Sequence, residues 1–436
     1  MADVRPFRGL RFNAAVTGPL GAALCPPYDI ISPADRERLL AASPYNAVRI
    51  ELSANGERAA VAEEYAAAAR TLELWRKEGA LTRESVPAYY VTRHEFVYQG
   101  RAMARTELTA AVRLEPLGKG SIKPHEDTRK GPKEDRLKLM TATRTNSSPV
   151  MLLYAQPALV GATLAEAQRS AAPLVADLGG GERLLAWPVT DAGATRKIQE
   201  ALAGEALYIA DGHHRYETAL AYRDESGRAA GDAANFAMAS LIAFDDPGLL
   251  SLPYHRLLKG LDEAAMGRLR AQMEKAFTPV QHNMRWCPPV EVAEAALASL
   301  GAADVVFEVW GLEAAQRTSL RLRNPETVSM IAGGHHSRAW ASLSTTLFRE
   351  ALLRPALGLQ EEEAEHRGLL AFSKDAADAV HQVNTGAFQL AFMPHAVPMD
   401  ALREVSDRGE RLPPKSTYFH PKLPTGLVLN PLEGAL

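Results

Sequence analysis

The sequence is poor in cysteine, has no long hydrophobic run and carries nearly balanced charge. Its two cysteines, Cys25 and Cys287, lie far apart and each precedes two prolines, so one disulfide at most could form and a disulfide-built scaffold is excluded. No segment approaches the ~18 apolar residues of a membrane-spanning helix, and the amino terminus lacks a basic stretch followed by an apolar one. We therefore expect reduced thiols and a cytoplasmic location.

The charge balance limits the classes of partner. Lysine and arginine number 49 against 52 aspartates and glutamates, which gives a formal net charge of -3. This balance provides no global field that would hold nucleic acid or an anionic membrane. Any site for an anion must therefore be local. We expect a small molecule as the substrate and neither a membrane nor a nucleic acid as partner. The sequence is compatible with a homodimer.

The composition is otherwise that of an ordinary folded protein. Hydrophobic residues make up 47% of the 436 positions and charged residues 23%, which excludes a disordered or collagen-like chain. A chain of this length exceeds what one hydrophobic core usually serves, so we expect two lobes. The predicted parts are an amino-terminal domain over 1–255, a carboxy-terminal α/β lobe over 256–405 and a tail over 406–436 that returns to the amino-terminal domain.

Helical and strand-type hydrophobic patterns alternate along the chain, which predicts an α+β fold with mixed α/β layering. The clearest helix covers 57–78 and ends at Gly79, and 89–97 with 108–112 indicate two strands joined by a turn. Further helices are expected near 162–176, 190–203, 213–226, 261–276, 289–300, 341–354 and 375–383, and further strands near 149–154, 206–210, 236–244, 304–311, 317–323 and 386–392.

The most informative local pattern is an apolar strand that runs through Asp211 and Gly212 into an amphipathic helix. Glycine permits a tight turn, after which the unpaired amides at the helix start present a positive dipole end. His213, His214 and Arg215 add donors at the same place, and the planar guanidinium of arginine suits phosphate. These five residues, called the Asp211 turn below, are predicted to bind a phosphorylated ligand.

Two other interpretations of the Asp211 turn are possible from the sequence. In the first, Asp211 caps the helix, one histidine is buried and hydrogen-bonded, and Arg215 pairs with Glu217 or another acid. In the second, both histidines bind zinc, but adjacent helical residues diverge by roughly 100° and no cysteine is nearby, which argues against a shared metal. A second His-His segment, from Gly333 to Arg338, lacks a preceding strand that enters a helix, and we expect a surface loop there.

A mixed-charge segment, residues 123–144, holds seven lysines and arginines against four acids. It is expected to begin as a loop and to become a helix near 133–143. It could close over phosphate groups or be no more than a solvated helix face. Its acids could hold Mg²⁺ through oxygen ligands, and we assign that part to Glu134 and Asp135. The candidate phosphate ligands in this segment are Lys123, His125, Arg129, Lys133 and Arg136.

Two proline-rich segments also hold polar side chains. Asp29 follows Pro26-Pro-Tyr and could act as a base or metal ligand on a rigid loop. Lys415, Ser416 and Thr417 follow a pair of prolines and could hydrogen-bond an anion. Plain turn structure explains both segments equally well.

Six motifs are distributed along nearly the whole chain. They are Arg5-Pro-Phe-Arg-Gly, Pro26-Pro-Tyr-Asp, Tyr45-Asn46, Gly131-Pro-Lys-Glu-Asp-Arg, Asp211-Gly-His-His-Arg-Tyr-Glu-Thr-Ala and Pro414-Lys-Ser-Thr-Tyr-Phe. Together they resemble the bacterial family known as domain of unknown function 1015. The family name implies no activity.

The Asp211 turn is also similar to the phosphate-binding turn of the ParB and sulfiredoxin superfamily, which includes CTP-binding partition proteins, ATP-using sulfiredoxin and free-serine kinases. This resemblance covers residues 211–220 and implies that Gly212, His213, His214 and Arg215 contact phosphate. The free-serine kinases share the doubled histidine. The cysteine of the sulfiredoxin turn is absent here, so sulfiredoxin chemistry is not expected.

These features predict a nucleotide-dependent phosphotransferase that acts on a small hydroxylated metabolite, with free serine as one candidate. ATP or ADP would bind at the Asp211 turn with Mg²⁺, and Asp29, Glu126 or Asp127 would take the hydroxyl proton. Two alternatives stay open. One is a nucleotide-binding switch of the ParB type without turnover, and the other is a phosphatase or nuclease in which the histidines or a metal activate water.

Overall fold

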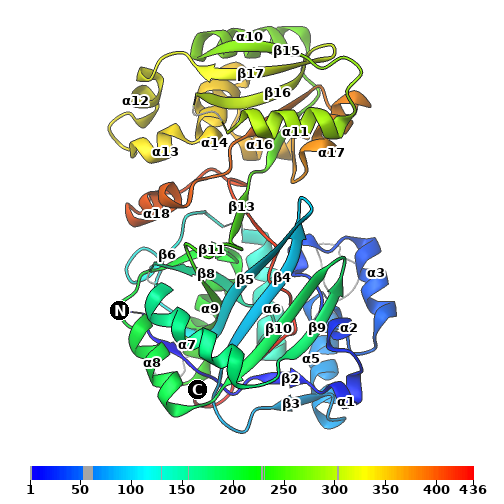
Figure 1. Cartoon of the computed structure of the whole chain (residues 1–436), viewed down its shortest axis with the longest axis vertical. Coiled ribbons are helices and arrows are strands. Elements are labelled where there is room, and N and C mark those ends of the chain that lie inside the picture. Colours follow the sequence, from blue (N-terminus) through cyan, green and yellow to red (C-terminus); the bar gives the residue numbers. More distant parts are fainter. Residues whose placement is uncertain are drawn as a thin grey trace. The chain divides into compact units, whose positions relative to one another are not determined.

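The structure, a computed structural model, describes residues 2–52, 62–128, 130–155, 157–226, 229, 231–301 and 304–436 (Figure 1). The chain divides into two compact units. Unit 1 consists of Met1–Pro124, Thr128–Leu250 and Pro421–Leu436, and unit 2 of His125–Asp127 and Ser251–His420. Both units combine helices with β-sheets, so the mixed α/β fold that the hydrophobic patterns predicted is confirmed.

A nine-stranded sheet forms the centre of unit 1. Its order is β6-β11-β8-β12-β5-β4-β10-β9, and β1 also pairs with β5. β11 is parallel to β6 and antiparallel to β8, and β8 is parallel to β12. The strands are β1 Val4–Arg5, β4 Tyr89–Tyr98, β5 Arg101–Arg113, β6 Ile122–Lys123, β8 Val150–Tyr154, β9 Leu174–Gly179, β10 Glu182–Val189, β11 Leu207–Asp211 and β12 Phe236–Ala243.

Strands β8 and β12 are buried along their whole length, which explains their uninterrupted apolar sequences. Helix α9 packs against both strands, and α7 packs against β4 and β10 beside α8 (Figure 1). The helices of unit 1 are α1 Ala14–Thr17, α2 Leu20–Ala23, α3 Pro33–Ala42, α4 Val48–Glu51, α5 Ala62–Lys77, α6 Lys130–Thr143, α7 Pro157–Ser170, α8 Ala192–Leu202 and α9 His213–Ser226, with the 3₁₀ turns η1 Tyr28–Ile30 and η2 Ala233–Asn235.

The carboxy-terminal segment, Pro421–Leu436, is an integral part of unit 1. Strand β21 (Asn430–Pro431) pairs with β7 (Thr145–Asn146). Isolated bridges join Thr425 to Cys25, Leu429 to Leu10 and Ala435 to Asp232. A further two-stranded sheet pairs β2 Leu10–Phe12 with β3 Leu81–Arg83. The segment therefore connects several early parts of the chain that are distant in sequence.

Unit 2 has a six-stranded sheet of order β15-β17-β16-β19-β14-β18 and its own hydrophobic cores. Its strands are β14 His255–Leu258, β15 Phe277–Asn283, β16 Val305–Glu313, β17 Gln316–Leu322, β18 Leu370–Ser373, β19 Leu390–Pro394 and the short β20 Tyr418–His420. The short strand β13 Leu250–Leu252 contains the boundary between the two units and pairs with β20. The helices of unit 2 are α10 Glu263–Ala276, α11 Pro289–Ser299, α12 Glu326–Ala332, α13 Arg338–Ser342, α14 Ser344–Leu347, the π-helix η3 Phe348–Leu353, α15 Arg354–Leu357, α16 Glu361–His366, α17 Ala376–Asn384 and α18 Met399–Asp407.

Two of the expected helices differ from the structure. The helix expected near 341–354 is interrupted, because Leu343 adopts an extended conformation between α13 and α14 and a π-helix follows. The helix expected near 162–176 ends at Ser170, and the hairpin of β9 and β10 that follows was not predicted.

The expected surface loop at Gly333 is confirmed, since Gly333 to His336 form an exposed turn. Within the described residues, no helix combines the length and apolarity needed to cross a membrane.

Candidate functional site

Gly212 allows the chain to pass directly from strand β11 into helix α9. Its φ of +87° lies in the region that L side chains rarely adopt, and a Cβ built there would lie 2.9 Å from Nε of Arg215. The backbone N–H of Tyr216 donates to the carbonyl of Gly212 at 2.9 Å, which begins the helix. Because glycine offers no capping side chain, residue 212 leaves the first-turn amides of α9 to other acceptors.

Two cations share the carboxylate of Asp211. The NH2 group of Arg215 lies 2.5 Å from Oδ2, and Nζ of Lys422 contacts Oδ1. Arg215 also donates from NH1 to the carbonyl oxygen of Pro149. Burial alone would raise the pKa of Asp211, but the nearby charges of Lys422 and Arg215 outweigh it and hold the pKa well below its usual range. Asp211 is therefore an anion that fixes two positive side chains beside the start of α9.

The two histidines are the first residues of α9. His213 is buried and His214 is half-buried. Arg215 pairs with an acid, as one interpretation expected, but the acid is Asp211. Glu217 accepts hydrogen bonds from Thr128 and Lys133. Among the residues that the structure describes, no group of three or more His, Cys, Asp and Glu side chains is placed to hold a metal ion.

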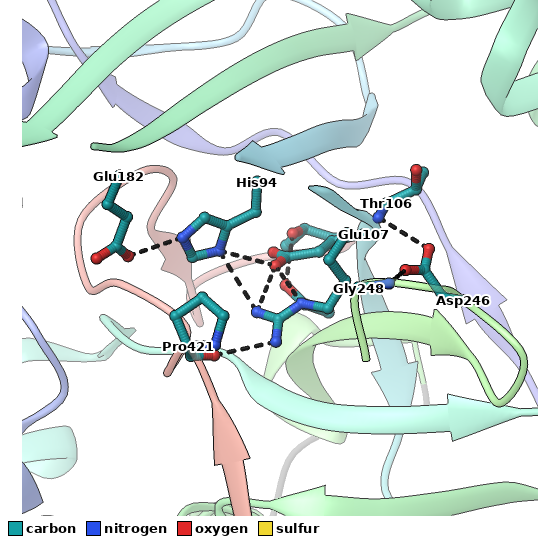
Figure 2. Close-up of polar contacts among 10 residues, drawn as sticks. His94, Thr106, Glu107, Glu182, Asp246, Gly248 and Pro421 are labelled. Atoms are coloured by element: carbon teal, nitrogen blue, oxygen red, sulfur yellow. Dashed lines mark hydrogen bonds and ion pairs between the residues drawn. The ribbon is translucent and has the colours of Figure 1, made fainter. Parts of the chain in front are cut away.

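A buried ionic network lies beside the chain that carries Lys422 (Figure 2). NH1 of Arg105 donates to the carbonyl oxygen of Pro421 at 3.0 Å. The same guanidinium contacts Oε1 of Glu107 from Nε at 3.0 Å and from NH2 at 2.7 Å. His94 lies between two carboxylates, with Nδ1 3.2 Å from Glu107 and Nε2 2.7 Å from Glu182. The network therefore fixes the peptide group immediately before Lys422.

Burial and charge act in opposite directions on the titrating members of this network. Burial alone would lower the pKa of His94, but hydrogen bonds with Glu107 and Glu182 raise it above its usual value. Burial would raise the pKa of Glu107, but the charge of Arg105 and the bond with His94 lower it. His94 is favoured as the protonated form and Glu107 as the anion, so the buried charges compensate one another.

The mixed-charge segment contributes to unit 1 through helix α6. Nζ of Lys133 lies 2.6 Å from Oε2 of Glu217 on α9. Arg136 is buried, donates from NH1 to the carbonyl of Glu51 at 2.6 Å and lies with Cζ 4.3 Å from the ring centre of Tyr28. Lys123 ends β6, which runs parallel to β11. Arg129 lies outside the described residues.

The candidate acids occupy different surroundings. Asp29 is exposed in η1, and Glu134 is exposed on α6. Asp135 accepts a hydrogen bond from Tyr65 at 2.8 Å and lies 2.5 Å from NH2 of Arg136, so both of its oxygens have protein partners. Glu126 and Asp127 belong to unit 2, where Asp127 lies 3.5 Å from Nε of Arg411.

The residues predicted after the proline pair at 413–414 also lie in unit 2. Ser416 is buried and donates to the carbonyl of Pro413 at 2.5 Å. Thr417 lies with Oγ1 3.2 Å from Nε2 of His125, which is buried in the same unit. Nζ of Lys415 lies 5.3 Å from the ring centre of Tyr254. Within unit 2 the fold therefore brings together two predicted ligands, His125 and Thr417.

A small cavity lies on the inner side of α9. Its volume is about 40 Å³, and α4, α6, α9 and strands β8 and β12 contribute to its wall. Two cations, Arg136 and Arg215, face it together with Glu51, which accepts hydrogen bonds from two serines, and with the buried Thr218. Oγ1 of Thr218 has no hydrogen-bond partner in the described part of the chain. Arg215 is thus shared by the Asp211 turn and this cavity.

Sequence reasoning missed three side chains in these surroundings, namely Glu51, Thr218 and Lys422. Lys422 lies in the same proline-rich segment, 413–422, as Lys415, and nothing in the local pattern distinguishes the two lysines. Its ion pair with Asp211 spans 211 positions of the chain, so only the fold reveals it. Glu217 had been considered as a partner for Arg215, and it binds Lys133 instead.

Comparison with solved structures finds distant similarities. A mutant free serine kinase in complex with ADP has 14% sequence identity, a TM-score of 0.34 and coverage of 70% of this chain and 93% of that one. A conserved hypothetical protein from Pyrococcus furiosus has 15% identity, a TM-score of 0.34 and coverage of 70% and 90%. Carboxy-terminally truncated SbnI from Staphylococcus aureus has 11% identity, a TM-score of 0.33 and coverage of 73% and 87%. At these values the likeness assigns neither a ligand nor an activity to this chain.

Among curated proteins, none matches this sequence. A family model described as "Protein of unknown function (DUF1015)" matches residues 4–336, which is more than half of the chain. The match extends from the first strands of unit 1 through the Asp211 turn and into unit 2. The chain therefore belongs to the DUF1015 family.

Proposed function

We propose that the protein transfers a phosphoryl group from a nucleoside triphosphate to a hydroxyl group of a small metabolite. The observation that carries the proposal is the Asp211 turn, in which a strand passes through Gly212 into a 14-residue helix and Arg215 is held beside the helix start by Asp211. First-turn amides and the positive end of the helix dipole favour a bound phosphate. The similarity of this turn to ParB, sulfiredoxin and free-serine kinases agrees with the proposal.

Phosphoryl transfer depends mainly on positioned donors and positive charge around the moving group. Amides at Gly212 and His213 would bind phosphate oxygens, and His214 and Arg215 would stabilise the added charge. Because Arg215 is held by both Asp211 and Pro149, its guanidinium loses little freedom when a phosphate binds. The cavity behind Arg215, of about 40 Å³, has room for ordered water beside the guanidinium.

A carboxylate would accept the proton of the acceptor hydroxyl, and the candidate within unit 1 is Asp29, which is exposed in η1. Replacement of the base should reduce kcat by about 100-fold or more with little change in nucleotide affinity. Asp29→Asn should therefore be compared with the wild type in a kinetic assay. If Asp29→Asn keeps full kcat, the assignment of Asp29 as the base is wrong.

Mg²⁺ would accompany the nucleotide phosphates, as it usually does in such enzymes. Of the two carboxylates predicted to hold the ion, Glu134 is the better candidate, because both oxygens of Asp135 already have protein partners. We further propose that the protein works in the cytoplasm on a small molecule, alone or as a homodimer.

The first test is a thermal-shift screen with ATP, ADP, CTP, GTP and pyrophosphate in the presence of Mg²⁺. A ligand that binds only the folded state raises the melting temperature. We expect a shift in the wild type that is lost in the double variant His214→Ala, Arg215→Ala, and a shift that survives in Arg8→Ala, whose side chain is exposed and hydrogen-bonds to a backbone carbonyl in another part of unit 1. The absence of any shift would overturn the proposal. Binding without turnover of any hydroxylated metabolite would favour a switch.

A further inference from the structure

The side chain of Lys422 comes from the carboxy-terminal segment and reaches the Asp211 turn. It is 7% exposed, and its ammonium contacts one oxygen of Asp211 while Arg215 contacts the other. Lys422 and Arg215 therefore both place positive charge beside the first turn of α9. Arg215 is directed further by the carbonyl of Pro149. Lys422 supplies a compact charge with three donors at the same place.

The backbone on both sides of Lys422 is fixed by unit 1. On one side, the carbonyl of Pro421 accepts a hydrogen bond from Arg105. On the other side, Thr425 exchanges backbone hydrogen bonds with Cys25 at 3.2 Å and 2.8 Å. A fully buried Arg105 held by Glu107, which His94 also contacts, is a costly way to hold a chain segment, since apolar packing would serve stability as well or better. The network does supply one directed donor to one backbone carbonyl.

We propose that Lys422 binds phosphate beside the Asp211 turn. Arg105, Glu107 and His94 are then positioning residues that hold Lys422 there. The inference rests on the proposed function and adds to it a ligand from the far end of the chain. In the absence of phosphate, Asp211 keeps the ammonium of Lys422 in place. When phosphate binds beside the first turn of α9, its oxygens become additional acceptors for Lys422, while Asp211 remains the partner of Arg215.

The test measures the affinity of the full-length protein for pyrophosphate by calorimetry. Lys422→Met should weaken binding about tenfold or more, the usual effect of one lost charge-assisted hydrogen bond, whereas Lys422→Arg should remain within about threefold of the wild type. The affinity of Lys422→Met should also depend less on salt concentration, because one cation is missing. The control is Glu433→Gln, which removes an exposed ion pair of the same segment with Arg144 and should leave the affinity unchanged.

Two outcomes would contradict the inference in different ways. If the wild type binds pyrophosphate and Lys422→Met binds it equally well, Lys422 is only an anchor of the segment and the proposed function stands. If the wild type binds neither pyrophosphate nor a nucleotide, the proposed function fails and this inference fails with it.

The positioning roles of Arg105, Glu107 and His94 need a measurement that general destabilisation of the protein does not affect. Glu107→Gln should weaken pyrophosphate binding about threefold to tenfold, in line with the loss of a hydrogen bond that orients Arg105. Leu202→Ala, which removes a fully buried side chain elsewhere in the core of unit 1, should lower the melting temperature without this loss of affinity. His94→Gln is the second variant if Glu107→Gln does not fold. Affinity in the network variants equal to that of Leu202→Ala would overturn the positioning roles.

Discussion

Thr218 has an unusual environment for a buried hydroxyl group. It is 1% exposed on α9, it faces the cavity behind Arg215, and Oγ1 has no partner among the described residues. A buried hydroxyl without a hydrogen bond costs about 1 to 3 kcal/mol. Thr218→Val keeps the shape of the side chain and removes that penalty. We expect the free energy of unfolding, measured by urea denaturation, to rise by about 1 kcal/mol.

The matched control is Thr109→Val. Oγ1 of Thr109 is also buried, but it lies 2.7 Å from Oγ of Ser240. The substitution leaves that serine without its partner and should lower the free energy of unfolding by about 1 kcal/mol. If Thr218→Val is as destabilising as Thr109→Val, the hydroxyl of Thr218 has a partner within the cavity, such as an ordered water.

His94 should make the stability of unit 1 depend on pH. Its pKa is raised from its usual 6.5, because hydrogen bonds with Glu107 and Glu182 outweigh burial. Folding therefore gains stability from the protonated histidine at pH values below 6.5, and this gain is lost as the pH rises through the higher pKa of the folded state. The free energy of unfolding, measured in urea between about pH 6 and pH 9, should fall more in the wild type than in His94→Gln. Equal slopes would show that His94 does not carry the effect.

At the scale of elements, the connection between β11 and α9 depends on the backbone of Gly212. An alanine there must adopt a positive φ, which costs about 1 to 2 kcal/mol, and its Cβ would displace the guanidinium of Arg215. Gly212→Ala should therefore destabilise the protein by at least that amount and weaken nucleotide binding as well. The comparison is Gly204→Ala, just before β11, where the added Cβ meets no atom within 4 Å. Loss of binding in both variants would mean that the turn is not specifically involved.

The sequence was sufficient to predict the elements whose hydrophobic period is regular. The expected strand 206–210 and helix 213–226 correspond to β11 Leu207–Asp211 and α9 His213–Ser226, because an apolar run is followed by glycine and an amphipathic repeat. The hairpin of β9 and β10 was missed. Pro188 lies within β10, and proline argues against a strand in sequence-based reasoning.

The surroundings of the Asp211 turn could be predicted only in part, because some of its contacts join residues that are distant in sequence. The contact of Arg215 with Asp211 is local in the chain, because it joins the end of β11 to the first turn of α9 only four positions later. The contacts of Lys422 with Asp211 and of Arg105 with Pro421 join distant positions that share no pattern. Such pairs depend on how the carboxy-terminal segment crosses unit 1, which only the tertiary structure specifies.

At the scale of the whole molecule, unit 1 is completed by the last residues of the chain. The carboxy-terminal segment buries Leu423, Val428, Leu429 and Leu432 within unit 1. Each such side chain contributes about 1.5 to 3 kcal/mol when fully buried. Their combined contribution is comparable to the total stability of a typical domain, which is about 5 to 15 kcal/mol. Unit 1 should therefore not fold stably without this segment.

A chain that ends at His420 tests this dependence. Unit 2 keeps both of its hydrophobic cores in that chain, so it should still unfold cooperatively in urea. Hydrogen exchange should show lost protection in β5, β8 and β12, since these strands belong to the sheet of unit 1, and retained protection in β16, β17 and β19. Retained protection in both sets would mean that unit 1 folds without its carboxy-terminal segment. Lys422 would then be supplied by a segment that unit 1 does not need for folding, and its removal would test binding without loss of the fold.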